Sequence, residues 1–131
     1  MIDILVKRAM VITVDSQRRV FMNGAIAINE GKIVEVGPSS ELEQKYPART
    51  VIDSSYKIAM PGMINCHMHL PQVMMRGVND NVEVMAKLKN YIWPIQGHYD
   101  EQDALISARL GLLEMIKSGT TAVIDMGTLH H

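Results

Sequence analysis

The sequence has 131 residues, a size that suits one ordinary domain, and 47% of them are hydrophobic while 21% are charged. Its formal net charge is −1, with lysines and arginines scattered along the chain, so the composition excludes the basic surface that nucleic acids or anionic membranes require. No stretch approaches the roughly 20 consecutive apolar residues that span a membrane, and the N-terminus lacks the basic and apolar regions of a signal peptide.

Short apolar runs separated by turns fill the first 57 residues. The sequence Asn29-Glu30-Gly31 predicts a hairpin turn in which Gly31 takes a positive φ. Residues 39–46 predict a short helix that a serine caps and Pro47 ends. Short strands with frequent turns are typical of a small β-sandwich, so residues 1–57 are predicted to be the N-terminal segment of such a domain. The predicted strands lie at residues 3–14, 20–28, 32–36, 50–53 and 57–60.

The stretch from Met60 to Leu70 organises the rest of the chain. It has the pattern of an apolar strand that begins after Pro61-Gly62 and ends in His67-Met68-His69. Because residues i and i+2 of a strand point to the same face, both imidazoles can reach one metal ion. An isolated pair of histidines with this spacing is more often structural or simply exposed. The surrounding sequence therefore has to show whether the pair binds a metal ion.

The residues before the histidines, Met60, Met63 and Ile64, predict a strand buried on both faces, as in a parallel sheet. Side chains at the carboxyl end of such a strand occupy the position where a (β/α)₈ barrel keeps its active site. Cys66 alternates to the face opposite the histidines, where we expect a small buried core residue rather than a third metal ligand. As the only cysteine it rules out an internal disulfide and fits a reducing, cytoplasmic compartment.

Helical periodicity dominates the sequence after the histidines. Residues 100–118 predict the clearest helix, capped by Asp100 and followed by Gly119. Its apolar stripe consists of Leu105, Ala108, Leu112, Met115 and Ile116. The other predicted elements are an irregular loop at residues 70–82, a helix at residues 82–93 that Pro94 ends, and a strand at residues 120–126. The order of strand, helix and strand predicts a right-handed parallel βαβ unit.

The segment Pro61–Leu70, PGMINCHMHL, resembles the Pro-Gly and His-x-His signature of the amidohydrolase superfamily of metal-dependent hydrolases. The downstream matches resemble its deaminase and chlorohydrolase branch, which includes methylthioadenosine/S-adenosylhomocysteine deaminases and triazine hydrolases. The resemblance covers nearly the whole chain, in order and at plausible spacing. Its further segments are residues 24–37, 51–53, 70–77, 92–94 and 118–121.

The resemblance implies an α/β fold. Residues 58–131 would be the first β/α units of a metal-dependent (β/α)₈ TIM barrel, and residues 1–57 part of the small β-sandwich that precedes it. A barrel needs roughly 250 residues, so the chain is expected to be an incomplete, N-terminal part with an exposed apolar barrel surface and a tendency to associate. The catalytic residues and remaining metal ligands are implied to lie in later strands, so the chain alone is expected to be inactive.

The function implied by the resemblance is hydrolytic deamination of a heteroaromatic ring: a purine, pyrimidine, nucleoside-like compound or triazine. His67 and His69 are implied to bind one divalent metal ion, zinc or alternatively iron, that activates water. Two alternatives stay open: a triazine-type chlorohydrolase, and a non-catalytic binding protein with the same fold. The implied partners are a small heterocyclic molecule and, for the full-length protein, further copies of itself, without nucleic acid or membrane.

Three residues match substrate-binding positions in the branch. Gln72 and Arg76 lie in the predicted loop, where the alternative is an exposed polar role and, for Arg76, a role in the structure of the loop. Gln96 lies where nucleoside deaminases carry a glutamate. Lys87 stands where many relatives carry a tryptophan that lines the substrate pocket, so this wall of the pocket departs from the branch. His130 and His131 are either native loop residues or the start of a purification tag.

Overall fold

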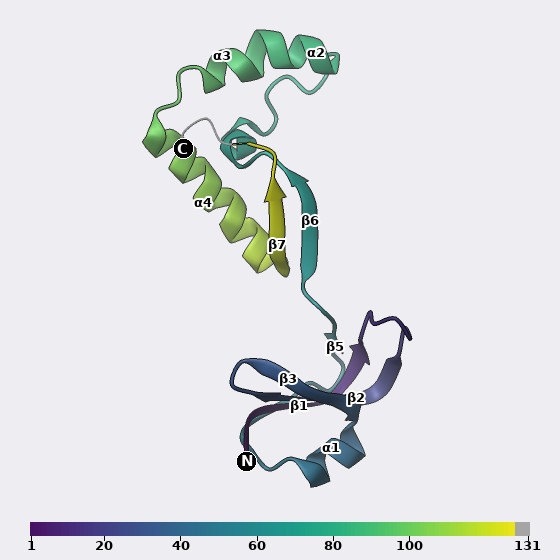
Figure 1. Cartoon of the computed structure of the whole chain (residues 1–131). Coiled ribbons are helices and arrows are strands. Elements are labelled where there is room, and N and C mark those ends of the chain that lie inside the picture. The colour runs from purple at the N-terminus through teal and green to yellow at the C-terminus, as the bar shows by residue number, and fades with distance from the viewer. Residues whose placement is uncertain (128–131) are drawn as a thin grey trace. The chain divides into compact units, whose positions relative to one another are not determined.

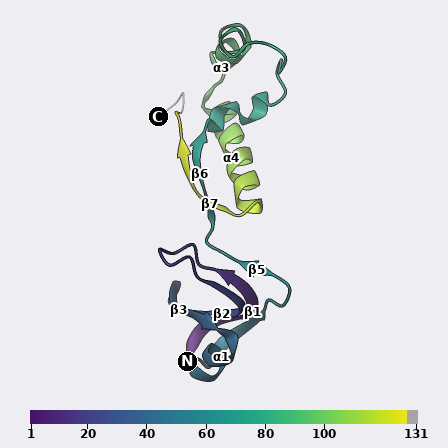
Figure 2. The ribbon, with the colours of Figure 1, turned by 90° about the vertical axis from the view of Figure 1, so that its right-hand side faces the viewer.

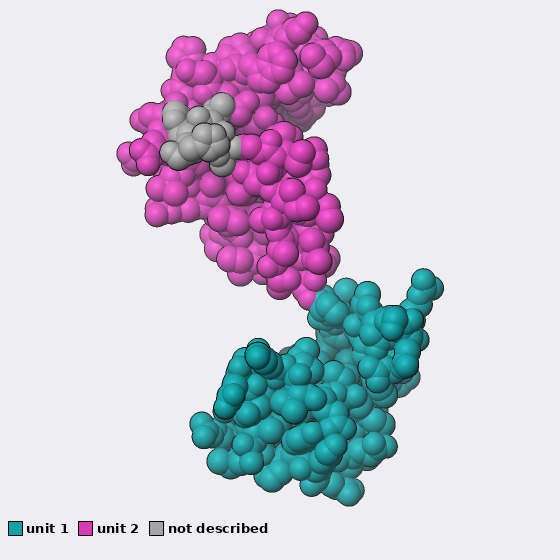
Figure 3. Space-filling model, viewed as in Figure 1, with its two compact units in different colours: residues 1–61 teal, residues 62–131 magenta. Residues whose placement is uncertain are grey.

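The computed structural model describes residues 1–127 and divides the chain into two compact units. The first comprises Met1–Pro61 and the second begins at Gly62 (Figure 3). The expectation for His130 and His131 lies outside the described residues. Among the helices of the described part, none is both long and apolar enough to cross a membrane.

Residues 1–61, all of them described, form a five-stranded mixed sheet and a helix, α1 (Ser39–Lys45) (Figure 1). The strand order is β3-β2-β1-β4, with β5 also paired to β1. Strand β2 is antiparallel to both β1 and β3, whereas β4 and β5 run parallel to β1. Their bounds are β1 (Ile2–Ile12), β2 (Val20–Asn29), β3 (Lys32–Pro38), β4 (Ala48–Asp53) and β5 (Ile58–Ala59).

The predicted hairpin between β2 and β3 is confirmed. Glu30 and Gly31 have φ values of 52° and 71°, the two left-handed residues of a type I′ turn. The core of this unit lies between the sheet and α1, and the alternate residues Ala25 and Ala27 of β2 point into it. Its buried members are Ile2, Leu5, Ala25, Ala27 and Leu42.

The predicted serine cap of α1 is wrong, since Pro38 occupies the N-cap position. The hydroxyl of Ser39 instead accepts the backbone N–H of Arg8 at 3.2 Å and donates to Glu43 at 2.8 Å. Arg8 has a φ of 61° where the pairing of β1 with β2 shifts register. This irregular amide needs a partner outside the sheet, and the buried serine supplies one.

The second unit contains the predicted parallel strand–helix–strand arrangement. Strands β6 (Met63–Met68) and β7 (Thr120–Asp125) pair in parallel, and α4 (Glu101–Lys117) lies along one face of the pair (Figures 1 and 2). The predicted irregular loop after β6 begins instead with a 3₁₀-helix, η1 (Leu70–Met75), which packs against α4.

The predicted helix at residues 82–93 is found as three consecutive helical segments, and Pro94 does not end it. They are α2 (Val84–Lys87), the π-helical turn η2 (Leu88–Ile92) and α3 (Trp93–Gln96). The π turn changes the hydrogen-bond register just before the proline. Pro94 then lies in the first turn of α3, where its missing N–H is tolerated.

Both predicted ends of α4 are confirmed, but most of its apolar stripe is exposed. Asp100 and Asp103 form a reciprocal capping box, and Gly119 has a φ of 84° after the last turn. Of the predicted stripe, Met115 is buried and Ala108 half-buried. The fully buried face of α4 consists of Ser107, Gly111 and Met115, whereas Leu105, Leu112 and Ile116 are exposed.

Small side chains explain why this face of α4 is the buried one. A Cβ built on Gly111 would lie 2.9 Å from Val73 Cγ2 and 3.0 Å from Leu70 Cδ2, so α4 approaches η1 too closely for larger residues. The close contact buries Ser107 completely, and its hydroxyl donates to the carbonyl of Leu70 at 2.8 Å. A pattern of large apolar residues cannot indicate a contact made by glycine and serine.

The predicted burial of β6 on both faces is also wrong for this chain. Met60, Met63 and Ile64 are exposed, and so is Cys66, which was expected to be a core residue. In the described part of the chain β6 has one neighbouring strand, β7, and its other edge is open. The apolar surface expected for this segment is therefore present.

Candidate metal centre

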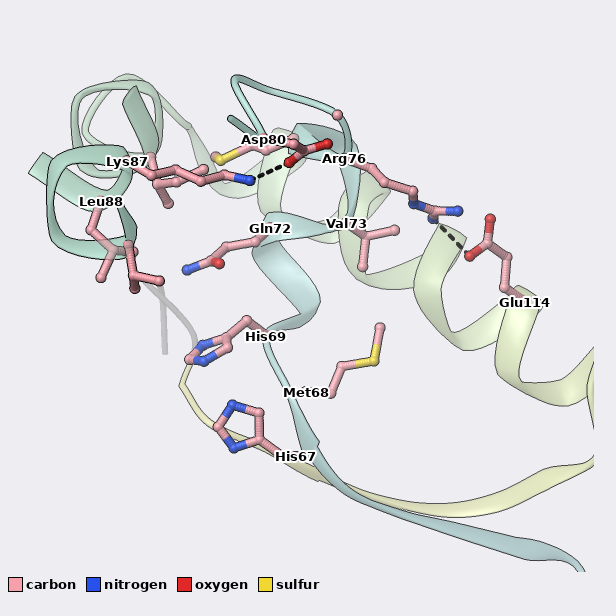
Figure 4. A pocket seen from close by; sticks show the side chains of 14 residues that line it. His67, Met68, His69, Gln72, Val73, Arg76, Asp80, Lys87, Leu88 and Glu114 are labelled. Carbon is pink, nitrogen blue, oxygen red and sulfur yellow. Dashed lines mark hydrogen bonds and ion pairs between the residues drawn. The ribbon is translucent and has the colours of Figure 1, made fainter. Parts of the chain in front are cut away.

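A local irregularity in β6 orients the two histidines. The pairing with β7 shifts register between Asn65 and Met68, and the side-chain oxygen of Asn65 accepts the backbone N–H of His67 at 3.2 Å. The amide nitrogen of Asn65 contacts the sulfur atoms of Met68 at 3.4 Å and Met115 at 3.7 Å. Met68 and His67 accordingly extend to opposite sides of the strand (Figure 4).

The imidazoles of His67 and His69 lie on the same side of the chain, as Figure 4 shows. Their ring centroids are 5.1 Å apart and their planes are inclined by 77°. A metal ion about 2.0–2.1 Å from one nitrogen of each ring lies about 3.2 Å from each centroid, and a tetrahedral angle then separates the centroids by about 5.2 Å. The observed separation of the ring centroids matches the separation expected for two adjacent ligands of one tetrahedral ion.

Hydrogen bonds with residues at the end of β7 fix the backbone on either side of His69. The carboxylate of Asp125 accepts the backbone N–H of Leu70 at 3.0 Å, and the N–H of Met126 donates to the carbonyl of Met68 at 2.7 Å. His69 lies between these two tethered positions. We did not predict this role for Asp125, although an acidic residue that closes a β-branched strand beside the His-x-His strand was a usable signal.

The histidines open onto a hollow with a volume of about 610 Å³. Gln72 and Arg76 also line it, but the guanidinium of Arg76 turns toward α4 and pairs with Glu114 at 2.8 Å (Figure 4). Gln96 is not among the lining residues, yet its side-chain oxygen accepts a hydrogen bond from Gln72 at 3.4 Å. The structure thus brings Gln72 to the histidines, links Gln96 to it, and turns Arg76 away.

The far wall of the hollow comes from α2 and η2. Val84, Leu88 and Ile92 supply apolar surface there, and Lys87 supplies a cation. The ammonium of Lys87 pairs with the carboxylate of Asp80 at 2.5 Å. Sequence reasoning did not identify Asp80, because the turns between η1 and α2 carry no pattern that pairs the two residues.

Within residues 1–127, no group of three or more histidine, cysteine or acidic side chains is arranged to bind a metal ion. His67 and His69 are thus two nitrogen donors without a third protein ligand from the described chain. Catalytic zinc sites usually have three protein ligands and a water. These residues fit part of such a site.

The segment that carries the two histidines also matches a known protein family. The model of the amidohydrolase family matches residues 58–131, more than half of the chain. The chain belongs to the amidohydrolase family. A model for the imidazolonepropionase-like composite domain of bacteria also matches residues 24–48, in the first unit. The amidohydrolase match thus covers the second unit, and the match in the first unit is to this composite domain.

Three known proteins are similar to this chain over most of its length. The chain is 36% identical over 124 residues to 5-methylthioadenosine/S-adenosylhomocysteine deaminase of Lawsonia intracellularis, covering 95% of this chain and 28% of the relative. Its fold matches the zinc-bound crystal structure of an adenosine deaminase from Xanthomonas campestris with a TM-score of 0.91 at 26% identity, covering 98% and 29% of the two chains. It matches the zinc complex of an atrazine chlorohydrolase from Arthrobacter aurescens with a TM-score of 0.79 at 32% identity, covering 93% and 28%. The chain thus spans less than a third of each relative's length.

Proposed function

We propose that this chain is the N-terminal part of a metal-dependent hydrolase that deaminates a heteroaromatic ring. The observation that carries the proposal is the pair of imidazoles at the end of β6, 5.1 Å apart and open to the same hollow. The deaminase relatives, one of them with bound zinc, support this reading. Zinc is the proposed metal, because neutral imidazole nitrogens suit it.

The proposed architecture extends beyond the two units described. Residues 1–57 would belong to a β-sandwich domain, and residues 58–131 would be the first β/α units of a TIM barrel. The parallel order of β6, α4 and β7 and the family match over residues 58–131 support the second assignment. For the whole protein we propose a homo-oligomer in the cytoplasm, a compartment that a single cysteine suits.

Each residue of the site has a proposed task. His67 and His69 would hold the ion, which when bound lowers the pKa of a coordinated water to about 7 and makes it a nucleophile at neutral pH. Asp125 and Asn65 fix the backbone that carries the histidines. Gln72 would hydrogen-bond the edge of the ring, because its amide lies beside the histidines in the hollow.

A triazine-type chlorohydrolase is the second candidate function. The hydrogen bond between Gln72 and Gln96 favours it, because triazine hydrolases resemble this sequence at both glutamines, whereas nucleoside deaminases carry a glutamate at the second position. Without that negative charge, Gln96 is a weaker acceptor for the hydroxyls of a ribose. Deamination remains the proposed reaction, because it is the activity named for the deaminase relatives.

Product release by the whole protein that carries this segment distinguishes these functions. The zinc-loaded protein is offered 5′-methylthioadenosine, guanine and a chlorotriazine, and the released ammonia and chloride are measured. We expect ammonia from an aminopurine, with loss of at least a hundredfold in kcat/KM for His67→Ala and for His69→Ala, whereas exposed His98→Ala retains activity. Chloride release alone selects the second function, and no product from any ring contradicts both and supports a binding protein.

A further inference from the structure

The wall of the hollow that faces the histidines carries a positive charge. Lys87 shares this wall with Val84, Leu88 and Ile92, which follow at the three- and four-residue spacing of one helical face. In Figure 4 the histidines lie at one end of the view and Lys87 at the other, with Gln72 between them. A ring bound at the histidines and beside Gln72 therefore directs its far substituent toward Lys87.

The ion pair of Lys87 is arranged so that a ligand can replace its acidic partner. The side chain of Lys87 is 28% exposed, whereas that of Asp80 is 62% exposed. Both residues line the hollow, and the carboxylate of Asp80 is the more exposed partner of the pair. A pair with one partner so exposed contributes little to stability, so exchanging Asp80 for another anion costs little.

The nearby charges select the kind of anion. Asp80 and Glu114 both line the hollow, and each is already paired with one cation, Lys87 or Arg76. A dianion such as a phosphate monoester would bring one more negative charge than the Asp80 it displaces, next to the carboxylate of Glu114, whereas a single carboxylate replaces Asp80 charge for charge.

We infer that Lys87 is a specificity-determining residue, and that the substrate is a heteroaromatic amine whose far substituent bears a carboxylate. The inference rests on the proposed function and extends it from the reacting ring to the substituent. Its carboxylate accepts a hydrogen bond from the Lys87 ammonium, while Asp80 moves into solvent. The π turn that starts at the next residue, Leu88, is consistent with this assignment, because such turns often lie at functional sites.

Equilibrium binding tests the inference without depending on turnover. The probes are adenosine-5′-carboxylic acid and its uncharged carboxamide, which have nearly the same shape, and the protein is the zinc-loaded whole protein that carries this segment. We expect the acid to bind about tenfold more tightly than the amide, the ratio for one charge-assisted hydrogen bond at a partly exposed site. Calorimetric titration gives both dissociation constants.

Three variants sharpen the result. Lys87→Gln should bind acid and amide equally, and Asp80→Asn should increase the preference for the acid, because the competing carboxylate is gone. Lys89→Gln is the matched control, since this lysine is exposed on the same helical run and does not line the hollow, and it should keep the wild-type ratio. A phosphorylated analogue, adenosine 5′-monophosphate, should bind less tightly than the acid.

Failure of this inference is distinguishable from failure of the proposed function. Equal binding of acid and amide by the wild-type protein, with deamination of a neutral aminopurine nucleoside intact, overturns the role of Lys87 alone. A preference for the acid that survives in Lys87→Gln has the same consequence, as does tighter binding of the phosphate. Failure of both probes to bind, together with absence of ammonia release, contradicts both.

Discussion

The two units of the chain differ in whether their apolar side chains form an enclosed core. In the first, β1, β2 and α1 enclose a core in which Leu42 is 1% exposed and Ala25 and Ala27 are fully buried. In the second, β6, β7 and α4 leave large apolar residues in contact with solvent. These are Ile64, Leu105, Ile106, Leu113, Ile116 and Ile124.

The difference shows which part of the sequence closes a hydrophobic core of its own. In the first unit α1 covers one part of the sheet and closes a core made by residues 1–61 alone, although Ile33, Val51 and Ile58 of the same sheet are exposed. The second unit instead organises the histidines through a few tight polar and small-residue contacts around η1. Large exposed apolar surfaces of this kind mark sites of interaction with further protein.

The largest predicted effect is on the enclosed core. Leu42→Ala should destabilise the first unit by about 2–5 kcal/mol, because it leaves a cavity between α1 and the sheet. Hydrogen exchange followed by mass spectrometry should show lost protection in β1 and β2 but little change in α4. Glu41→Ala, on the exposed side of α1, is the control. Unchanged protection in β1 and β2 would mean that α1 does not seal this core.

Ser107→Ala should affect the second unit instead. The change removes the donor to the Leu70 carbonyl and the acceptor for the Met74 N–H, at 2.8 and 3.3 Å, from a fully buried site. The expected cost is about 1–3 kcal/mol, measured by urea unfolding with the fluorescence of Trp93, the only tryptophan. Ser118→Ala, at the exposed end of α4, should cost less, and equal costs would argue against a special role for the buried hydroxyl.

The pH dependence of stability should be concentrated in the first unit. A hydrogen bond from Lys7, and then one from Ser39, holds the pKa of Glu43 below its ordinary value of 4.5. Lys45, followed by Tyr46, lowers the pKa of Glu35 in the same way. Because protons bind these carboxylates more weakly in the folded state, their stabilisation is present above pH 4.5 and is lost as the pH falls through the lower folded pKa.

Urea titrations between pH 3 and pH 7 measure this dependence. The unfolding free energy of the first unit should decline below about pH 4.5, and Glu43→Gln should flatten the decline. Glu30→Gln, in the exposed hairpin turn, is the matched control. An unchanged slope in Glu43→Gln would show that its contacts with Lys7 and Ser39 do not persist in solution.

The smallest predicted change in stability concerns the exposed apolar surface. Ile124→Thr keeps a β-branched residue in β7, and the side chain is 55% exposed, so the unfolding free energy should change by no more than about 0.5 kcal/mol. Self-association should nevertheless decrease, which sedimentation velocity at increasing concentration measures. A large loss of stability would mean that Ile124 is already packed in solution.

Much of the fold followed from local signals in the sequence. The hairpin at Gly31, the capping of α4 by Asp100 and the parallel pairing of β6 with β7 each depend on neighbouring residues or on periodicity. The helix through Pro94 was missed, because a π turn moves the proline to a tolerated position. The buried face of α4 was missed because Gly111 and a serine make its contact.

Only the part of the site that lies on a single strand could be predicted from the sequence. The spacing of His67 and His69 placed two imidazoles together without knowledge of the fold. The partners of those residues come from other elements: Asp125 from β7, and Glu114, which draws Arg76 away, from α4. Such contacts depend on tertiary packing, which local patterns do not specify.

The metal content of the whole protein that carries this segment tests the central claim most directly. We expect about one zinc ion per chain in the wild-type protein by elemental mass spectrometry, the occupancy of one catalytic zinc site. The double variant His67→Ala/His69→Ala should lose that ion, whereas His98→Ala should keep it. Unchanged zinc in the double variant would contradict the assignment of the two imidazoles as metal ligands.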